Sequence, residues 1–308
     1  MNTNRLLKTV VGGIFLSLSL SAQAALLHLW DFEAGAELQD SAGGLNLNTA
    51  LGEGNIGGVA GTAGDIAYET GFGGVGQAYR PYYVDPLQSS TAGAGLTGSG
   101  FSSPGQFTIE AIVKADGKTT GSAVNYIFQT RPGSDRGYYL IQDEDNVGAG
   151  SIGGLGSIIG NNFGNVGIAT EFVADGTWLY IAAVIDLTSV AGMASANIYT
   201  ANLSAGDIAP SLSLSKTWNT ASPSALAGEL GVFGIGNFAI DRNGDGVAEA
   251  SQEWFQGAID YVAIYDSLLD PTDLSDNLRA RIGTPVPEPG TLALLGLAAL
   301  LVSGWRRH

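Results

Sequence analysis

The chain has 308 residues, a net charge of −16 and 45% hydrophobic residues, so it holds enough apolar material for a packed core. Its 46 glycines, without a Gly-X-Y period, exclude collagen and suit turns between short strands rather than long helices. The absence of cysteine excludes disulfides, thiol catalysis and Cys-based metal sites, and two histidines leave almost nothing for a Ser–His–Asp triad. The acidic surplus argues against nucleic acid as a partner and also fits simple solubility.

Residues 1–24 have the pattern of a secretory signal peptide. Arg5 and Lys8 supply the positive start, residues 9–21 form the apolar middle, and Ala22 and Ala24 form a small-x-small cleavage site. We therefore expect a cleaved signal helix and a mature chain that begins at Ala25. The alternative is an uncleaved anchor helix, for which the apolar run is short.

The body of the chain, from residue 25 to about 266, alternates short β runs with turn-forming residues. This pattern predicts a β-sandwich or barrel. Part of residues 43–96 and the glycine-rich residues 148–164 are predicted as long loops. The predicted strands cover residues 26–32, 107–113, 125–130, 138–142, 167–172, 178–187, 196–200, 229–234 and 257–265.

One helix is predicted in the body, over residues 271–280. Asp270 can cap it, Pro271 suits the first helical position, and Asp273 lies in the first turn, where a negative charge is favourable. Leu274 and Leu278 are four residues apart and share one face.

Four segments follow one another in a defined order and spacing: Leu29-Trp30-Asp31-Phe32-Glu33 with Asp40-Ser41-Ala42-Gly43, then residues 107–114, 178–186 and 255–266. Together they resemble the laminin G-like, concanavalin A-like jelly-roll family. The resemblance implies an all-β antiparallel jelly-roll sandwich over residues 25–282. Tyr180 departs from the family pattern, which usually has His there. We expect Trp30, Ile109, Trp178 and Ile259 to be buried on inward strand faces.

The sequence argues against catalysis. Folds of this type also host glycoside hydrolases, which need two carboxylates that flank the sugar bond. Acidic residues would then alternate along a strand, since residues i and i+2 share a face. Glu110 stands alone on its strand, while Asp143, Glu144 and Asp145 are adjacent and typical of a solvated turn. We therefore predict no catalytic residues.

Two places are candidates for structural Ca²⁺. The run from Asp241 to Gly246 matches the front half of an EF-hand-type loop, although position 12 is Gln252 rather than Glu. The alternative is an acidic Asx-rich turn. The second candidate is Asp260, because the family resemblance implies an Asp on the last strand that joins backbone carbonyls around calcium. The candidate ligands in the loop are Asp241, Asn243, Asp245, Val247 through its carbonyl, and Glu249.

Five aromatic residues could offer stacking faces for sugars, and packing in the core or at a sheet edge is the alternative for each. They are Tyr79, Tyr82, Tyr83, Trp218 and Trp254.

The carboxyl end consists of Val286-Pro287-Glu288-Pro289, an apolar stretch over residues 290–305 that we expect to form a transmembrane-like helix, and Arg306-Arg307. The stretch is somewhat short for a membrane span, and the arginines favour a cytoplasmic end. This order resembles the PEP-CTERM sorting signal of Gram-negative bacteria, which implies processing by a membrane-embedded exosortase. A plain carboxyl-terminal anchor is the alternative. Both place the body outside the cytoplasm, with the tail in the inner membrane at least transiently.

We thus expect a signal peptide (residues 1–24), a laminin G-like domain (25–282) and a sorting tail (283–308). The predicted function is a non-enzymatic cell-surface or matrix protein that binds polysaccharide or a surface protein within an exopolysaccharide matrix. A purely structural matrix protein and a glycoside hydrolase are the alternatives.

Overall fold

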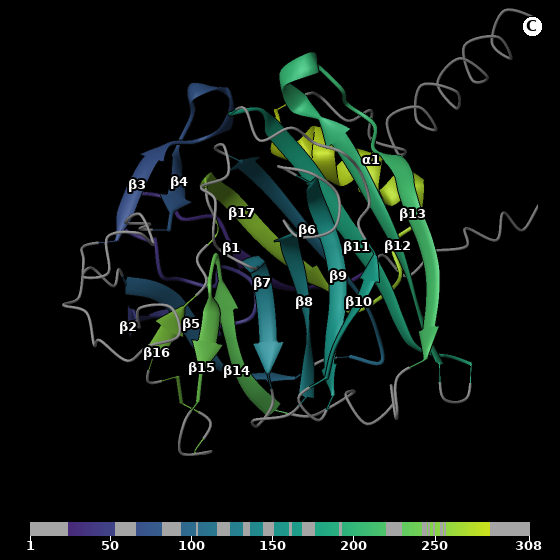
Figure 1. Cartoon of the computed structure of the whole chain (residues 1–308). Helices are drawn as coiled ribbons and strands as arrows, with labels where there is room; N and C mark the ends of the chain where they lie inside the picture. Colours follow the sequence, from purple (N-terminus) through teal and green to yellow (C-terminus); the bar gives the residue numbers. More distant parts are fainter. Residues whose placement is uncertain are drawn as a thin grey trace, which may run out of the picture.

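Two β-sheets packed face to face form the body of the protein, and one α-helix covers the outer face of one sheet (Figure 1). This computed structural model describes residues 24–52, 66–81, 94–102, 104–115, 124–131, 136–143, 151–159, 162–167, 176–190, 193–219, 230–241, 245, 247–248, 250–252, 255 and 257–283. The prediction of a mostly β sandwich is confirmed.

The first sheet, sheet A, is antiparallel. Its central strand β17 pairs with β6 along one side, while β4 and β1 share the other side: Ile259 lies opposite Tyr79, and Val262 opposite Trp30. The strand order is β13 (Ser211–Asn219), β12 (Met193–Asn202), β11 (Trp178–Val190), β6 (Gln106–Ala115), β17 (Gly257–Tyr265), β4 (Gln77–Arg80) and β3 (Ala67–Thr70), with β1 (Leu26–Trp30) beside β17.

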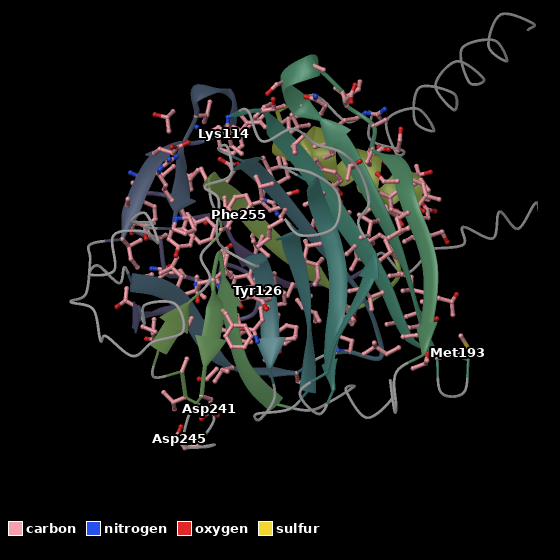
Figure 2. All side chains as sticks on the ribbon, in the orientation of Figure 1. Lys114, Tyr126, Met193, Asp241, Asp245 and Phe255 are labelled. Carbon is pink, nitrogen blue, oxygen red and sulfur yellow. The ribbon has the colours of Figure 1, made fainter. Side chains whose placement is uncertain are left out.

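The second sheet, sheet B, is antiparallel except where β16 and β2 pair in parallel. After β16, the buried Phe255 donates its N–H to the Gly236 carbonyl at 2.8 Å, which ties this end of the sheet to the core (Figure 2). The order is β10 (Asn162–Gly167), β9 (Ser151–Ile159), β8 (Arg136–Asp143), β7 (Val124–Arg131), β14 (Leu230–Ile235), β5 (Ala94–Ser102), β2 (Asn48–Gly52), β16 (Ala250–Gln252) and β15 (Phe238–Ile240).

The predicted long loop over residues 148–164 is wrong. This stretch holds β9 and the start of β10, with β9 paired to β8 on one side and β10 on the other. Glycine weakens a strand, but hydrogen bonds from both neighbours outweigh that local preference. Part of residues 43–96 holds β2, β3 and β4, while residues 53–65 and 82–93 of this stretch lie outside the described residues. The predicted strand over 167–172 falls almost wholly outside the described residues.

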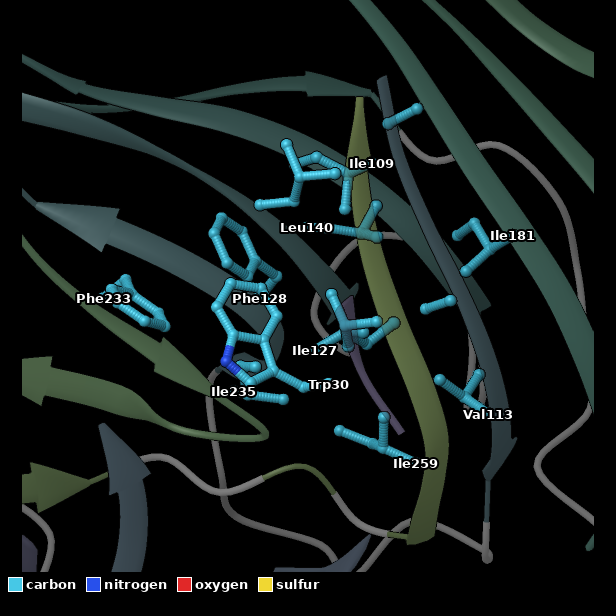
Figure 3. Close-up of a cluster of buried hydrophobic side chains, with 14 of the residues drawn as sticks. Trp30, Ile109, Val113, Ile127, Phe128, Leu140, Ile181, Phe233, Ile235 and Ile259 are labelled. Carbon is cyan, nitrogen blue, oxygen red and sulfur yellow. The ribbon is translucent and has the colours of Figure 1, made fainter. Parts of the chain in front are cut away.

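The main core fills the space between the sheets. Trp30, Ile109 and Ile259 are fully buried in it, as predicted, and Trp30 packs on Phe233 with ring centroids 5.2 Å apart (Figure 3). Alternate residues of β6, such as Ile109 and Val113, point into this core. The residues between them face the other side of sheet A.

A second apolar cluster lies on that other side, beneath helix α1 (Pro271–Arg281). It includes Ile112, Tyr180, Tyr261, Leu274 and Leu278. Because both faces of the central strands are covered, residues 178–185 form a nearly continuous apolar run without alternation.

The prediction that Trp178 faces the inner core is therefore wrong. It is half-buried and packs at the margin of the second cluster, since Leu179 and Ile181 take the inward positions of β11.

The predicted helix is confirmed and extends to Arg281. The Asp270 carboxylate accepts N–H groups from Thr272 at 2.7 Å and Asp273 at 3.0 Å, so the first turn is capped as the sequence indicated. At the other end, the Arg281 guanidinium lies 4.9 Å from the Tyr261 ring centroid. No helix in the described part of the chain has the length and apolar character that a bilayer span requires.

Candidate functional site

One end of sheet A brings together an aromatic side chain, an ion-pair network and an acidic group. The loop between β3 and β4, residues 71–76, contains the short 3₁₀-helix η1 (Phe72–Gly74) and turns tightly. Gly73, Gly74 and Gly76 have positive φ angles of 69°, 79° and 66°, which side-chain-bearing residues rarely adopt. The loop thus carries Phe72 back over the outer face of the sheet.

Trp178 is the centre of the aromatic part. It lies opposite Lys114 on the neighbouring strand, and the Lys114 ammonium is 5.3 Å from the Trp178 ring centroid. The Phe72 ring packs nearly perpendicular to Trp178 with centroids 6.0 Å apart. Val75, at the tip of the loop, is 75% exposed. Aromatic and aliphatic surface therefore reaches solvent at this end of the sheet.

Glu69 links two cations beside this aromatic surface. Its Oε2 atom accepts from Arg80 Nη1 at 2.8 Å, and its Oε1 atom pairs with Lys114 Nζ. The side chains of all three residues are partly exposed. We call Glu69, Phe72, Arg80, Lys114 and Trp178 the Trp178 surface. It offers an apolar ring together with positioned donors and acceptors, which is the chemistry that binds polar ligands with an apolar face.

Asp260 lies against the same loop, where its Oδ1 atom accepts the Phe72 N–H at 2.9 Å. Burial raises the pKa of Asp260 to about 6, and the negative charges of Glu33 and Asp31 add to this rise, while the Phe72 N–H and Arg281 oppose it. A neutralising partner at Asp260 would therefore be favourable.

The glycines around Asp260 leave no room for side chains. A Cβ atom on Gly71 would overlap both Asp260 Oδ1 and the Val75 carbonyl oxygen, and one on Gly76 would overlap the Glu33 carboxylate. Oxygen atoms thus converge on the loop. Within the described residues, however, no three His, Asp or Glu side chains are grouped closely enough to hold a metal ion by themselves. Backbone carbonyls would have to complete any site here.

The predicted calcium loop lies elsewhere. Asp241 and Asp245 follow β15 at the opposite end of the molecule from Lys114 (Figure 2). Asp245 Oδ1 accepts the N–H of Val247 at 2.9 Å, an Asx-type turn, and Val247 is 55% exposed. Asn243 and Glu249 lie outside the described residues. The structure therefore separates the two candidate calcium sites.

Among the predicted sugar-stacking residues, Tyr79 is not available to stack on a sugar. It is fully buried, with its ring packed against Phe32 at 5.5 Å, because position 79 faces the core between the sheets. Tyr82, Tyr83 and Trp254 lie outside the described residues, as does the side chain of Trp218. Trp178, which the sequence indicated as core, is instead half-buried and lies at the margin of the outer cluster.

The signal-cleavage residue Ala22 and the sorting residues Val286, Pro287, Glu288, Pro289, Arg306 and Arg307 also lie outside the described residues.

A buried carboxyl group beneath α1 is a feature that the sequence analysis did not identify. Glu110 Oε1 accepts the Tyr180 hydroxyl at 2.8 Å and the Asn277 amide at 3.0 Å. Burial raises the pKa of Glu110 to about 7 against these hydrogen bonds and the charge of Arg281. Because Glu110 is fully buried under the helix, it cannot reach a substrate and instead joins α1 to sheet A. In the sequence, the sign of this buried carboxyl group was a lone acidic residue within an otherwise apolar stretch of β6.

His28, the one histidine of the body, has a structural partner. Its Nδ1 atom lies 2.6 Å from Asp40 Oδ2, and Asp40 also accepts backbone N–H groups from Leu29, Gly43 and Leu45, each at 2.9 Å. Burial alone would raise the pKa of Asp40, but these hydrogen bonds hold it below its usual value. The carboxylate thus anchors the turn after β1.

Comparison with known proteins identifies one sequence motif and one shared fold. Residues 285–307 match the PEP-CTERM protein-sorting motif. No curated protein matches the sequence. Domain 4 of AbnA, a GH43 extracellular arabinanase from Geobacillus stearothermophilus solved in complex with arabinotriose, has a TM-score of 0.54 and 18% identity. That match covers 82% of this chain and 98% of the domain.

Two further similarities are more distant. The CBM40 of Ruminococcus gnavus IT-sialidase bound to α2,3-sialyllactose has a TM-score of 0.37 and 15% identity, over 56% of this chain and 82% of that one. A SAP-like pentraxin from Limulus polyphemus has a TM-score of 0.37 and 13% identity, over 61% and 75%. Similarity at that level does not define a common fold. This chain is thus a two-sheet β-sandwich, similar in fold to the arabinanase domain, with a carboxyl-terminal PEP-CTERM protein-sorting motif.

Proposed function

We propose that this chain is a non-enzymatic protein, sorted to the cell surface, whose β-sandwich binds polysaccharide through the Trp178 surface. The observation that carries the proposal is the half-buried Trp178 beside the Lys114–Glu69–Arg80 network. A sugar ring has apolar C–H faces and hydroxyl edges, so it needs an aromatic platform and nearby donors and acceptors. Lys114 has a long flexible stem and can move from the ring to a sugar hydroxyl.

The charge of the body favours an uncharged polysaccharide as the ligand. Residues 25–285 hold nine basic and 28 acidic residues, a balance of −19, which repels a polyanionic chain. Both cations of the Trp178 surface are paired with Glu69, so they offer hydrogen bonds rather than excess positive charge. In this proposal the domain is a laminin G-like jelly roll that acts within an exopolysaccharide matrix.

A glycan-array screen of the full chain in mild detergent tests this function. We expect saturable binding to neutral polysaccharides and no release of shortened products. Absence of binding to every glycan would contradict the proposal and favour a purely structural matrix protein. Turnover of a bound polysaccharide would instead support a glycoside hydrolase.

Calcium at Asp260 is part of the proposal. The Asp260 carboxylate, the Val75 carbonyl and nearby Glu33 supply the oxygen atoms that Ca²⁺ prefers, and a bound cation would offset the repulsion that Glu33 and Asp31 exert on Asp260. Asp241, Asn243, Asp245, Val247 and Glu249 are proposed as a separate loop site.

We expect Ca²⁺ to raise the melting temperature more than equal Mg²⁺, because a cation that binds only the folded state stabilises it by about 2.7 kcal/mol at one hundred times its Kd. Thermal melts with Ca²⁺ and with chelator check this. Asp260→Ala should remove the rise in melting temperature if Ca²⁺ binds mainly at Asp260. Asp241→Ala combined with Asp245→Ala should remove it if Ca²⁺ binds mainly in the loop after β15. A full calcium response in the triple variant would contradict both sites.

The sorting motif supports processing of the tail by an exosortase-type enzyme in the inner membrane. We expect the mature surface protein to lack Arg306 and Arg307, and we expect replacement of Pro287 and Glu288 by Ala to leave an unprocessed, membrane-bound form. Intact-mass measurement of surface protein checks this. A complete tail on the mature protein would show a plain membrane anchor instead.

A further inference from the structure

The residue predicted to become the amino terminus after signal-peptide removal is held by a carboxylate. Ala25 N donates to Asp266 Oδ1 at 2.9 Å, and the Ala25 carbonyl accepts the Asp266 N–H at 3.1 Å. Asp266 follows the last residue of β17, and Ala25 precedes the first residue of β1, so this contact closes the end of the β1–β17 pair.

The turn that follows Asp266 is also held by contacts that do not involve Ala25. The buried Thr108 hydroxyl donates to the Ser267 carbonyl at 2.8 Å and accepts the Leu269 N–H at 3.0 Å. These two bonds fix the turn between β17 and α1. The backbone just after Asp266 is therefore fixed independently of Ala25, and the Asp266 carboxylate lies where it meets Ala25 N.

We propose that Asp266 is a binding site for the α-ammonium group that processing creates on Ala25. In the precursor, Ala25 N is a neutral amide. Hydrolysis of the bond between Ala24 and Ala25 gives Ala24 a carboxylate and Ala25 an amine, which is protonated at neutral pH. The amide hydrogen bond then becomes a charge-assisted ion pair, which is stronger. Removal of the signal peptide would thus fasten β1 to β17 more tightly. This inference rests on cleavage after Ala24 and is independent of sugar binding.

The test is a double-mutant cycle on the chain that ends at His308. One arm begins at Ala25 and the other retains Ala24, which moves the ammonium group one residue away and restores the amide. Each is made with Asp266 and with Asp266→Asn. Because an exposed ion pair contributes only modestly to stability, we expect retention of Ala24 to lower the melting temperature by about 1–3 °C when Asp266 is present. It should have no effect in the Asp266→Asn variant, and the difference should shrink in about 1 M NaCl.

Asp207→Asn is a matched control, because Asp207 is also an exposed carboxylate that accepts a backbone N–H, from Asn202 at 3.0 Å. The effect of Asp207→Asn on the melting temperature should be the same in the chain that begins at Ala24 and in the chain that begins at Ala25. If retention of Ala24 has an equal effect with Asp266 and with Asp266→Asn, the proposal is overturned, since the effect would reflect only the packing of Ala24. A mature amino terminus other than Ala25, found by mass spectrometry of secreted protein, would also overturn it.

Discussion

Replacing Ile259 by Ala should lower the free energy of unfolding by about 2–5 kcal/mol, because removal of a large buried side chain leaves a cavity that the core does not fill. Ile259 is fully buried on β17, where it faces the main core between Tyr79 and Val113 on the two neighbouring strands (Figure 3). Its strand is the central element that joins β6, β4 and β1. A cavity there therefore loosens contacts on both sides of the strand.

Denaturant unfolding of the full chain measures this loss. Val75→Ala is the control, since Val75 is 75% exposed and a surface truncation changes stability by about 0.5 kcal/mol or less. A loss below about 0.5 kcal/mol for Ile259→Ala would show that this residue does not face the core.

Glu110→Gln should stabilise the protein at pH 8 and have little effect near pH 4. The pKa of Glu110 is raised from 4.5 to about 7, so between these values the folded state holds a proton that the unfolded state has released. The unfolding free energy of the wild type therefore falls as the pH rises through this window. Gln keeps the acceptor for Tyr180 and Asn277 but carries no charge. At pH 8 the gain should approach about 3 kcal/mol, since each pKa unit corresponds to about 1.36 kcal/mol.

The measurement is unfolding by denaturant across pH 4–8. Asp276→Asn removes a partly exposed charge from the same helix and serves as control, with a small effect expected at every pH. The pKa of Asp260 is also raised, so its ionisation lowers the unfolding free energy as the pH rises, both in wild type and in Glu110→Gln. An equal difference between wild type and Glu110→Gln at pH 5 and pH 8 would contradict the buried, charge-disfavouring environment of Glu110.

The sequence predicted the sandwich and its last helix well, because alternation and capping are local signals. Residues 107–113 alternate cleanly, and Asp270-Pro271 marks a helix start, so both elements were found. Residues 151–159 were missed, because their glycines resemble a loop until strands pair on both sides.

The candidate site was less predictable from the sequence. Both faces of β11 are covered by apolar side chains, and the site depends on which residues of that strand face away from the main core. The run from Trp178 to Ile185 is apolar on both faces, so its register is not visible in the sequence. Glu69 and Lys114 are 45 positions apart and meet only through the pairing of β3, β4, β17 and β6. The sequence left both a surface and a core position open for Tyr79, and pairing of β4 with β3 and β17 places it in the core.

The role of Trp178 in polysaccharide binding is tested by the affinity of the intact chain for a neutral polysaccharide, compared between wild type and Trp178→Ala. We expect the Kd of the variant to be at least about tenfold higher. Loss of a Trp anchor costs about 2 kcal/mol of binding free energy, and about 1.4 kcal/mol corresponds to a tenfold change in Kd. Trp178→Phe should retain most of the binding. Tyr199→Ala, a partly buried aromatic at the margin of the same cluster and opposite Ala182, should bind like wild type. If wild type and a folded Trp178→Ala bind polysaccharide equally well, the Trp178 surface is not the binding site.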